Sequence, residues 1–159
     1  MTSVIIGGLI GFAGGIIAGL LPVFLQNRRE RRGLACSLAG EISAIVESLE
    51  KRQYEQSLEQ LIQKINTTND PGHYTVRLEQ NYFVVYEANA AKIGLLPQHA
   101  AQEVARFYTF AKSLFEDATD KNFDPKKPED AIRRLNEMLF FLRLLIQIGK
   151  SVEIELKAV

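Results

Sequence analysis

Apolar residues follow two patterns along the chain: one unbroken run near the N-terminus, and helical spacing after it. Residues 4–25 comprise 15 apolar residues, six glycines and one proline, with no charged residue. At about 1.5 Å of rise per residue, a helix over this run is roughly 33 Å long, and the hydrocarbon core of a bilayer is about 30 Å thick. The run therefore predicts a transmembrane helix.

A cleaved signal peptide and a buried core helix are the alternatives for this run. The leader Met1-Thr2-Ser3 carries no cationic side chain, and the basic residues follow the apolar run instead of preceding it. Signal peptides have the opposite arrangement. A membrane span explains the pattern better, so we assign residues 1–27 to a transmembrane anchor.

A basic juxtamembrane collar follows at residues 28–33. Its cations are Arg28, Arg29, Arg31 and Arg32. Cytoplasmic flanks of membrane helices carry the excess of Lys and Arg. We therefore expect a single pass through the plasma membrane (the inner membrane if the source is bacterial), with the N-terminus outside and residues 34–159 in the cytoplasm. The arginines also lie where anionic headgroups of membrane lipids attract cations, so a lipid contact and a purely topological role both stay open.

Small residues gather on one face of the predicted span. At about 100° per residue they occupy one half of the helix, and branched apolar side chains such as Ile5 and Leu9 occupy the other. The face consists of Gly7, Gly8, Gly11, Gly14, Gly15, Ala18 and Gly19. Each helical glycine costs about 1 kcal/mol relative to alanine, and in lipid the compensation is close approach of a second helix. We predict helix packing, either with a second copy or with a helix of a partner protein.

Beyond the collar, apolar positions recur at steps of three and four, which predicts helices. The expected helices cover 34–66 with a break near Arg52-Gln53, then 79–92, 97–118 and 129–156. Gly94 is expected to cap the second of these, and alternation over 74–78 allows one short extended segment. The predicted fold is all-α: one N-terminal transmembrane helix followed by a cytoplasmic bundle of three to four helices.

The last predicted helix is apolar on nearly every face at its centre. Residues 138–146 contain one charge, Arg143. Such a segment is either the central helix of a bundle or presents a face to another protein. Arg143 is expected to extend to the surface, and the alternative is a pair with a carboxylate at an interface.

Composition excludes several classes of protein. The 159 residues carry 19 basic and 19 acidic side chains and one cysteine. A neutral chain gives no electrostatic indication of nucleic-acid binding, so no nucleic-acid partner is expected. One cysteine excludes an internal disulfide framework and a multi-cysteine zinc site. The balance also conceals an uneven distribution, since the collar is positive and residues 33–159 are mildly acidic.

Candidate chemistry is sparse. His99 and Glu103 are four residues apart on one expected helix. A surface ion pair is a simpler interpretation of this spacing than a metal site. Cys36 follows the collar and is interpreted as a small helix residue, with a reactive or lipidated thiol as the alternative. The polar residues Asn81, Tyr82, Tyr86 and Asn89 are interpreted as capping and core groups. We predict no catalytic residue, no metal site, no cofactor and no enzymatic activity.

A short pattern carries a family resemblance. The segment Tyr86–Pro97, YEANAAKIGLLP, followed by Phe107-Tyr108, resembles a pattern in small bacterial membrane-anchored helical proteins that have no assigned function. The similarity covers about 30 residues. It implies no catalytic residue and no ligand.

Taken together, these patterns predict a non-enzymatic, single-pass interaction or adaptor protein that self-associates through the glycine face. One alternative is an accessory subunit docked on a larger membrane complex. The other is a pore-forming or membrane-perturbing effector, which is disfavoured because residues 4–25 offer no polar side chain to line a channel.

Overall fold

A computed structural model describes the backbone of residues 2–70, 82–119 and 127–159, and the side chains within these ranges from residue 22 onward. Helices and short connections make up this part of the chain, with no β-strand. The elements are α1 (Thr2–Lys51), α2 (Tyr54–Thr68), α3 (Val84–Asn89), the 3-10 helix η1 (Ala90–Leu95), α4 (Gln98–Thr119) and α5 (Pro128–Lys157). The predicted all-α bundle is confirmed, and the extended segment expected at 74–78 lies outside the described residues.

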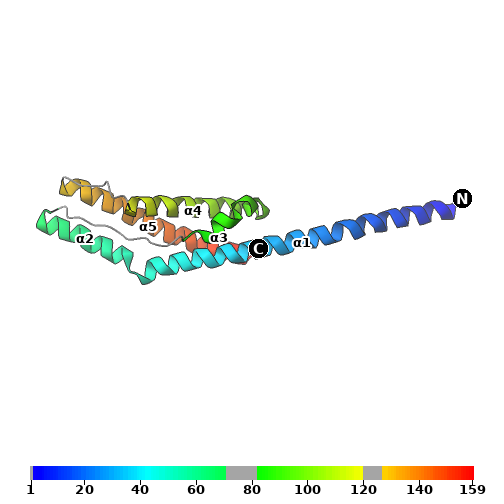
Figure 1. Cartoon of the computed structure of the whole chain (residues 1–159), viewed down its shortest axis with the longest axis horizontal. Helices are drawn as coiled ribbons and strands as arrows, with labels where there is room; N and C mark the ends of the chain where they lie inside the picture. The colour runs from blue at the N-terminus through cyan, green and yellow to red at the C-terminus, as the bar shows by residue number, and fades with distance from the viewer. Residues whose placement is uncertain (1, 71–81, 120–126) are drawn as a thin grey trace.

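Helix α1 continues without interruption from the N-terminal run into the bundle. Its first half projects away from the other helices, and its second half packs among them (Figure 1). The buried side of the second half includes Leu38, Ile42, Ile45 and Leu49. These residues are spaced by four, three and four, which confirms the predicted stripe.

The break expected near Arg52-Gln53 separates two helices. Gln53 adopts a left-handed backbone with φ of 53°, a conformation that costs a non-glycine residue roughly 1–2 kcal/mol. Helix α2 begins at the next residue and takes a new direction (Figure 1). The turn lets α2 bury Ile65 against Ala131 and Leu135 of α5, and this burial opposes the cost of the strained residue.

The helix predicted over 79–92 is wrong in its extent. Helix α3 covers only Val84–Asn89 and then tightens into η1, while residues 79–81 lie outside the described part. Gly94 lies inside η1 and is not a left-handed cap. Leu96 takes the extended conformation that a residue before proline favours, so Pro97 sets the end of this segment.

Helix α5 is the central helix of the bundle, as one of the two sequence interpretations predicted. It runs antiparallel to both the second half of α1 and α4, and it also contacts α2 (Figure 1). It begins with Pro128 in its first turn and with Glu129 and Asp130 near its positive end. Leu142, Leu145 and Val152 are buried on it, facing the buried Val104 and Phe107 side of α4.

A glycine permits the closest approach of α5 to its neighbours. A Cβ atom added to Gly149 would lie 2.5 Å from Cγ2 of Val46 on α1 and 2.8 Å from Cε2 of Phe107 on α4. Val46 is β-branched and Phe107 is fully buried, so neither side chain can move aside freely. Gly149 therefore sets the spacing of three helices at one level of the core.

Within the described residues, no helix combines the length and the hydropathy that a bilayer crossing requires. The predicted glycine face, Gly7 to Gly19, lies outside the residues whose side chains are described, as does most of the predicted span at 4–25. Both stay predictions.

Substitution of Gly149 by alanine tests the close approach. Overpacking of a filled core costs about 1–3 kcal/mol, so the free energy of unfolding of Gly149→Ala should fall despite alanine's better helix propensity. Gly40→Ala is the matched control, because nothing lies within 4 Å of a Cβ at this position, and it should gain up to about 1 kcal/mol. Urea denaturation of the full chain, followed by tyrosine near-UV circular dichroism, measures the free energy of unfolding of both variants. Equal changes in this free energy would contradict the close packing at Gly149.

Candidate functional site

One carboxylate joins three elements of the bundle. Glu41 of α1 accepts hydrogen bonds from the Tyr108 hydroxyl of α4 at 2.6 Å and from the backbone N–H groups of Val85 and Tyr86 at 2.6 and 3.0 Å. The two N–H groups belong to the first turn of α3, where a negative charge is favourable. Glu41 therefore acts as the N-terminal cap of α3 from a distant part of the chain.

Glu41 is a functional residue that its local sequence does not predict. The available signal was its position three residues after Leu38 and next to Ile42, at the edge of the buried stripe of α1. A carboxylate at such an edge needs hydrogen-bond donors from a neighbouring element. The pattern alone does not say which element supplies them.

Aromatic side chains surround this carboxylate. The rings of Tyr86 and Tyr108 stack with their centroids 4.0 Å apart, and Phe83 stacks on Phe115 at 5.3 Å. Asn89 donates its side-chain amide to the carbonyl of Val85. Asn89 thus makes a local hydrogen bond but no N-terminal cap, Tyr82 and Tyr86 pack against the core, and Asn81 lies outside the described residues.

Tyr108 stays protonated to unusually high pH. Its side chain is fully buried. This burial, together with the hydrogen bond to Glu41, raises the pKa of its hydroxyl above the ordinary value near 10. The group is therefore a fixed donor to Glu41 and is unsuited to general-base work near neutral pH.

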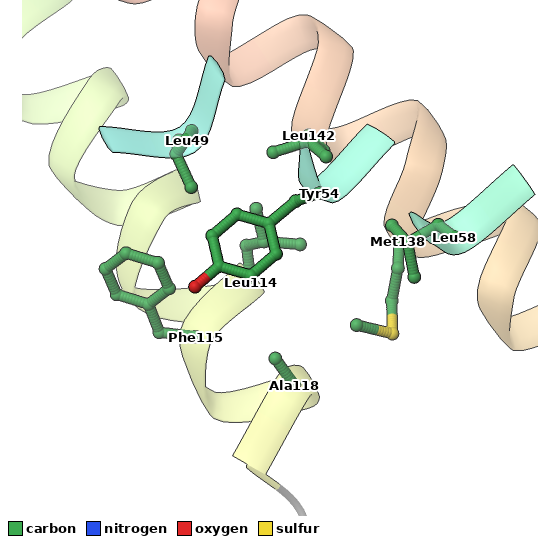
Figure 2. Close-up of a pocket in the computed structure, with 8 residues that line it drawn as sticks. All are labelled: Leu49, Tyr54, Leu58, Leu114, Phe115, Ala118, Met138 and Leu142. Atoms are coloured by element: carbon green, nitrogen blue, oxygen red, sulfur yellow. The ribbon is translucent and has the colours of Figure 1, made fainter. Parts of the chain in front are cut away.

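A small apolar pocket lies where α1 turns into α2. Its volume is about 50 Å³, which is close to the space of one or two water molecules. Figure 2 shows the Tyr54 ring in its middle, between Phe115 and Leu142. The lining residues are Leu49, Tyr54, Leu58, Leu114, Phe115, Ala118, Met138 and Leu142. The Tyr54 hydroxyl is the one polar side-chain group among them, so the pocket offers a packing gap and not a reaction site.

Arg143 extends to the surface, as predicted, and it is paired there with two carboxylates of a neighbouring helix. Its Nε lies 2.6 Å from a carboxylate oxygen of Glu55, and one of its terminal nitrogens lies 2.5 Å from an oxygen of Glu59. Both carboxylates come from α2, one turn apart. About half of each partner remains exposed, so solvent weakens the pairs. They lie beside the apolar contact of Ile65 with α5, and this contact sets which face of α2 meets α5.

The predicted ion pair between His99 and Glu103 is wrong, because His99 contacts a different carboxylate. His99 Nδ1 lies 2.9 Å from Glu155 at the end of α5, and this contact raises the pKa of the His99 imidazole. Glu103 instead faces Arg106 at 3.6 Å. Cys36 is exposed. Within the described residues, no group of three His, Cys, Asp or Glu side chains is arranged to hold a metal ion.

One face of α5 remains uncovered in a single chain. Phe140 is 62% exposed and Phe141 37% exposed, and Phe141 lies 6.1 Å from the ring of Phe110 on α4. The apolar centre of α5 is therefore core on most sides and surface on one. The central-helix interpretation is confirmed, and a contact of the exposed face with another protein stays a prediction.

An open pocket of about 360 Å³ lies where α1 leaves the bundle. It is lined by Phe24, Asn27, Arg28 and Arg31 of α1 and by Leu95 of η1. Two of the four predicted collar arginines are thus brought together with an apolar wall from a distant segment. Arg29 and Arg32 do not line this pocket. We call these five residues the collar pocket.

The collar concentrates four cations around a single carboxylate, Glu30, which accepts a hydrogen bond from Gln26. In the described part of the chain, Arg28, Arg29, Arg31 and Arg32 form no ion pair and no side-chain hydrogen bond. Many cations elsewhere face carboxylates: Lys51, Arg106, Lys112, Arg133, Arg134, Arg143, Lys150 and Lys157. Within the described residues, Arg52, Lys64, Lys92 and Lys127 form no ion pair either, but they are scattered over the bundle and do not cluster as the collar arginines do. The Nε of Arg31 is enclosed by protein and has no acceptor within the described residues. The positive charge of the collar is therefore unneutralised by the bundle.

Removal of the Tyr108 hydroxyl tests the role of Glu41. A hydrogen bond to a charged group contributes about 1.5–3 kcal/mol, and Tyr108→Phe should lower the free energy of unfolding by this amount at pH 8. The difference in the free energy of unfolding between the two proteins should narrow above pH about 10. Tyr108 then loses its proton in the unfolded chain but keeps it in the folded protein, so the stability of wild type falls.

Tyr86→Phe is the control for this experiment, because it keeps the ring stack and the Tyr86 hydroxyl makes no hydrogen bond within the described residues. It should change stability little at either pH. Urea denaturation at both pH values supplies the measurement. A loss of the same size in both variants would contradict a special role for the Tyr108 hydroxyl.

Comparisons with known proteins give no relative from which a function can be transferred. No protein-family model matches the chain, and no curated protein or solved structure is significantly similar to it. The resemblance of residues 86–108 to small bacterial membrane-anchored proteins stays a prediction.

Proposed function

We propose that this chain is a non-enzymatic, single-pass membrane protein whose helical bundle serves as an interaction or adaptor domain, and which self-associates through its glycine face. The observation that carries the proposal is the course of α1. This helix is continuous from Thr2 to Lys51, joins the uncharged run at 4–25 to the bundle, and passes through unpaired arginines on the way. An uncharged run ending in a basic cluster is the arrangement of a membrane anchor.

Exposed apolar side chains at the end of the run support the same proposal. Val23, Phe24 and Leu25 are 55%, 65% and 44% exposed in the isolated chain. The described bundle therefore does not cover this turn of α1. Apolar side chains at consecutive positions around a helix need an apolar surrounding on every side, which a bilayer provides.

The glycines of the run argue for a helix partner inside the bilayer. Lipid tails are as apolar as leucine, so helices in a membrane associate through close packing and not through the hydrophobic effect. Six glycines within 22 residues weaken the helix by about 1 kcal/mol each relative to alanine unless a neighbour exploits the exposed backbone. A second copy of the same face is self-complementary and needs no other component.

An accessory subunit is the second candidate, and the exposed aromatic surface favours it. Phe140, Phe141 and Phe110 form a surface away from the collar that a larger partner would cover. We propose this role as the alternative to self-association. By the charge rule, the N-terminus lies outside and the bundle in the cytoplasm, at the inner membrane if the source is bacterial.

Leucine substitutions on the glycine face test self-association. Gly11→Leu together with Gly15→Leu should convert an oligomer in mild detergent into monomer, because the added side chains hold the backbones apart. Size-exclusion chromatography with multi-angle light scattering measures the mass of the protein component. Ala13→Leu is the control, because residue 13 lies about 200° from residue 11 and carries its bulk on the opposite face. A monomeric wild type that recovers one defined membrane complex would support the accessory subunit instead.

The single cysteine tests the orientation. Cys36 is exposed and lies just beyond the collar. A membrane-impermeant maleimide should leave it unlabelled in intact cells and label it once the membrane is permeabilised. A Ser3→Cys variant in a Cys36→Ser background should show the reverse. Labelling of Cys36 in intact cells would overturn the proposed topology.

A further inference from the structure

We infer that the collar pocket, formed by Phe24, Asn27, Arg28, Arg31 and Leu95, binds one anionic phospholipid, with its phosphate on the two arginines and its chains toward the two apolar residues. The inference rests on the proposed membrane function and deepens it. It assigns a specific ligand class to two of the four collar arginines.

The geometry of the pocket matches an amphiphile. Phe24, Asn27, Arg28 and Arg31 follow steps of three, one and three and therefore share one face of α1. Leu95 closes the opposite side from η1, and about 360 Å³ lies between them. Cationic and apolar walls meet in one cavity, as a charged headgroup attached to acyl chains requires.

The electrostatics call for an anion from outside the chain. Neither Arg28 nor Arg31 faces a carboxylate within the described residues, and the enclosed Nε–H of Arg31 has no acceptor there. Enclosed N–H groups in proteins nearly always have a hydrogen-bond partner. A phosphate diester offers several acceptor oxygens, and two guanidinium groups can bind it with charge-assisted hydrogen bonds.

The depth of the pocket agrees with a lipid. If the span ends at Leu25, Arg28 lies about 4.5 Å and Arg31 about 9 Å further along the helix axis. The headgroup region of one leaflet is roughly 5–8 Å thick. Phe24 then lies at the edge of the hydrocarbon and Arg28 lies within the headgroup layer. The backbone of Arg31 lies just beyond this layer, and its long side chain can reach back to the phosphates. A free phosphate would use the arginines but would gain nothing from Phe24 and Leu95, both of which are exposed in the isolated chain.

Other parts of the molecule are less suited to a ligand. The apolar pocket around Tyr54 is too small, and the Phe140–Phe141 surface has no feature that selects a partner. The His99–Glu155 pair is a surface contact between two helix ends. The collar pocket alone among these combines space, unneutralised charge and an apolar wall.

Two double variants of equal charge test the inference. Arg28→Gln with Arg31→Gln removes the pocket cations, and Arg29→Gln with Arg32→Gln removes the same charge outside the pocket. Full-length protein in an uncharged detergent is titrated with dihexanoyl phosphatidylglycerol by isothermal calorimetry. The pocket variant should bind about tenfold or more weakly than wild type, because it loses two charge-assisted hydrogen bonds. The matched variant should stay within about threefold of wild type.

Two further ligands and one further variant separate the contributions of charge and of the acyl chains to the affinity. Dihexanoyl phosphatidylcholine, which has no net charge, and glycerol 3-phosphate, which has no chains, should both bind at least about tenfold more weakly than the anionic lipid. Leu95→Ser should weaken binding of the anionic lipid and leave the affinity for glycerol 3-phosphate unchanged. Equal losses in the two arginine variants would overturn the inference in favour of diffuse charge. Tight binding of glycerol 3-phosphate would overturn it in favour of a free phosphate site.

Failure of the proposed function is detected separately. Alkaline carbonate extracts a protein that is not integral to the membrane, and mass measurement in detergent reports self-association; neither readout depends on the collar pocket. Extraction by carbonate would refute the anchor, and loss of lipid selectivity would refute the pocket. Circular dichroism should give the same helicity for both arginine variants, because glutamine and arginine have similar helix propensity.

Discussion

Packing of α5 against the second half of α1 is the contact on which the rest of the structure depends. Gly149 brings the two helices close enough for Val46 of α1 and Phe107 of α4 to meet at the same level. Since α5 runs antiparallel to α1, its C-terminal end lies where α1 leaves the bundle (Figure 1). The start of α4 is held at the same end by the contact of His99 with Glu155. One close packing therefore brings several distant segments next to the collar.

Glu41 links the packed helices to the collar pocket through α3 and η1. By accepting the first N–H groups of α3 and the hydroxyl of Tyr108, it attaches a short, otherwise weak helix to both α1 and α4. η1 follows α3 directly and carries Leu95 to the face of α1 that presents Arg28 and Arg31. A partly buried hydrogen-bond network thus positions Leu95 beside two cations that lie 67 and 64 residues earlier in the chain. This link connects the stability of the bundle with the proposed lipid site.

Much of the fold could be predicted because its long helices are amphipathic. The stripe from Leu38 to Leu49, the break at Gln53 and the limits of α4 all follow from periodicity and from turn chemistry around proline. The α3–η1 segment could not, because six residues of helix have little intrinsic stability and depend on Glu41. The ion-pair partner of His99 could not be predicted either. Local spacing suggested Glu103 on the same helix, whereas the packing of α4 against α5 brings Glu155 to His99.

The sequence by itself determined an uncharged N-terminal run, its glycine spacing, the arginines after it and the helical class of the remainder. These properties are local, and they can be read from neighbouring residues along one helix. Only the tertiary structure decided that Arg143 meets two carboxylates of α2, that Gly149 is a contact point, and that Arg28 and Arg31 share a pocket with Leu95. Such contacts join residues far apart in the chain, and they are set by how whole helices pack rather than by any local pattern.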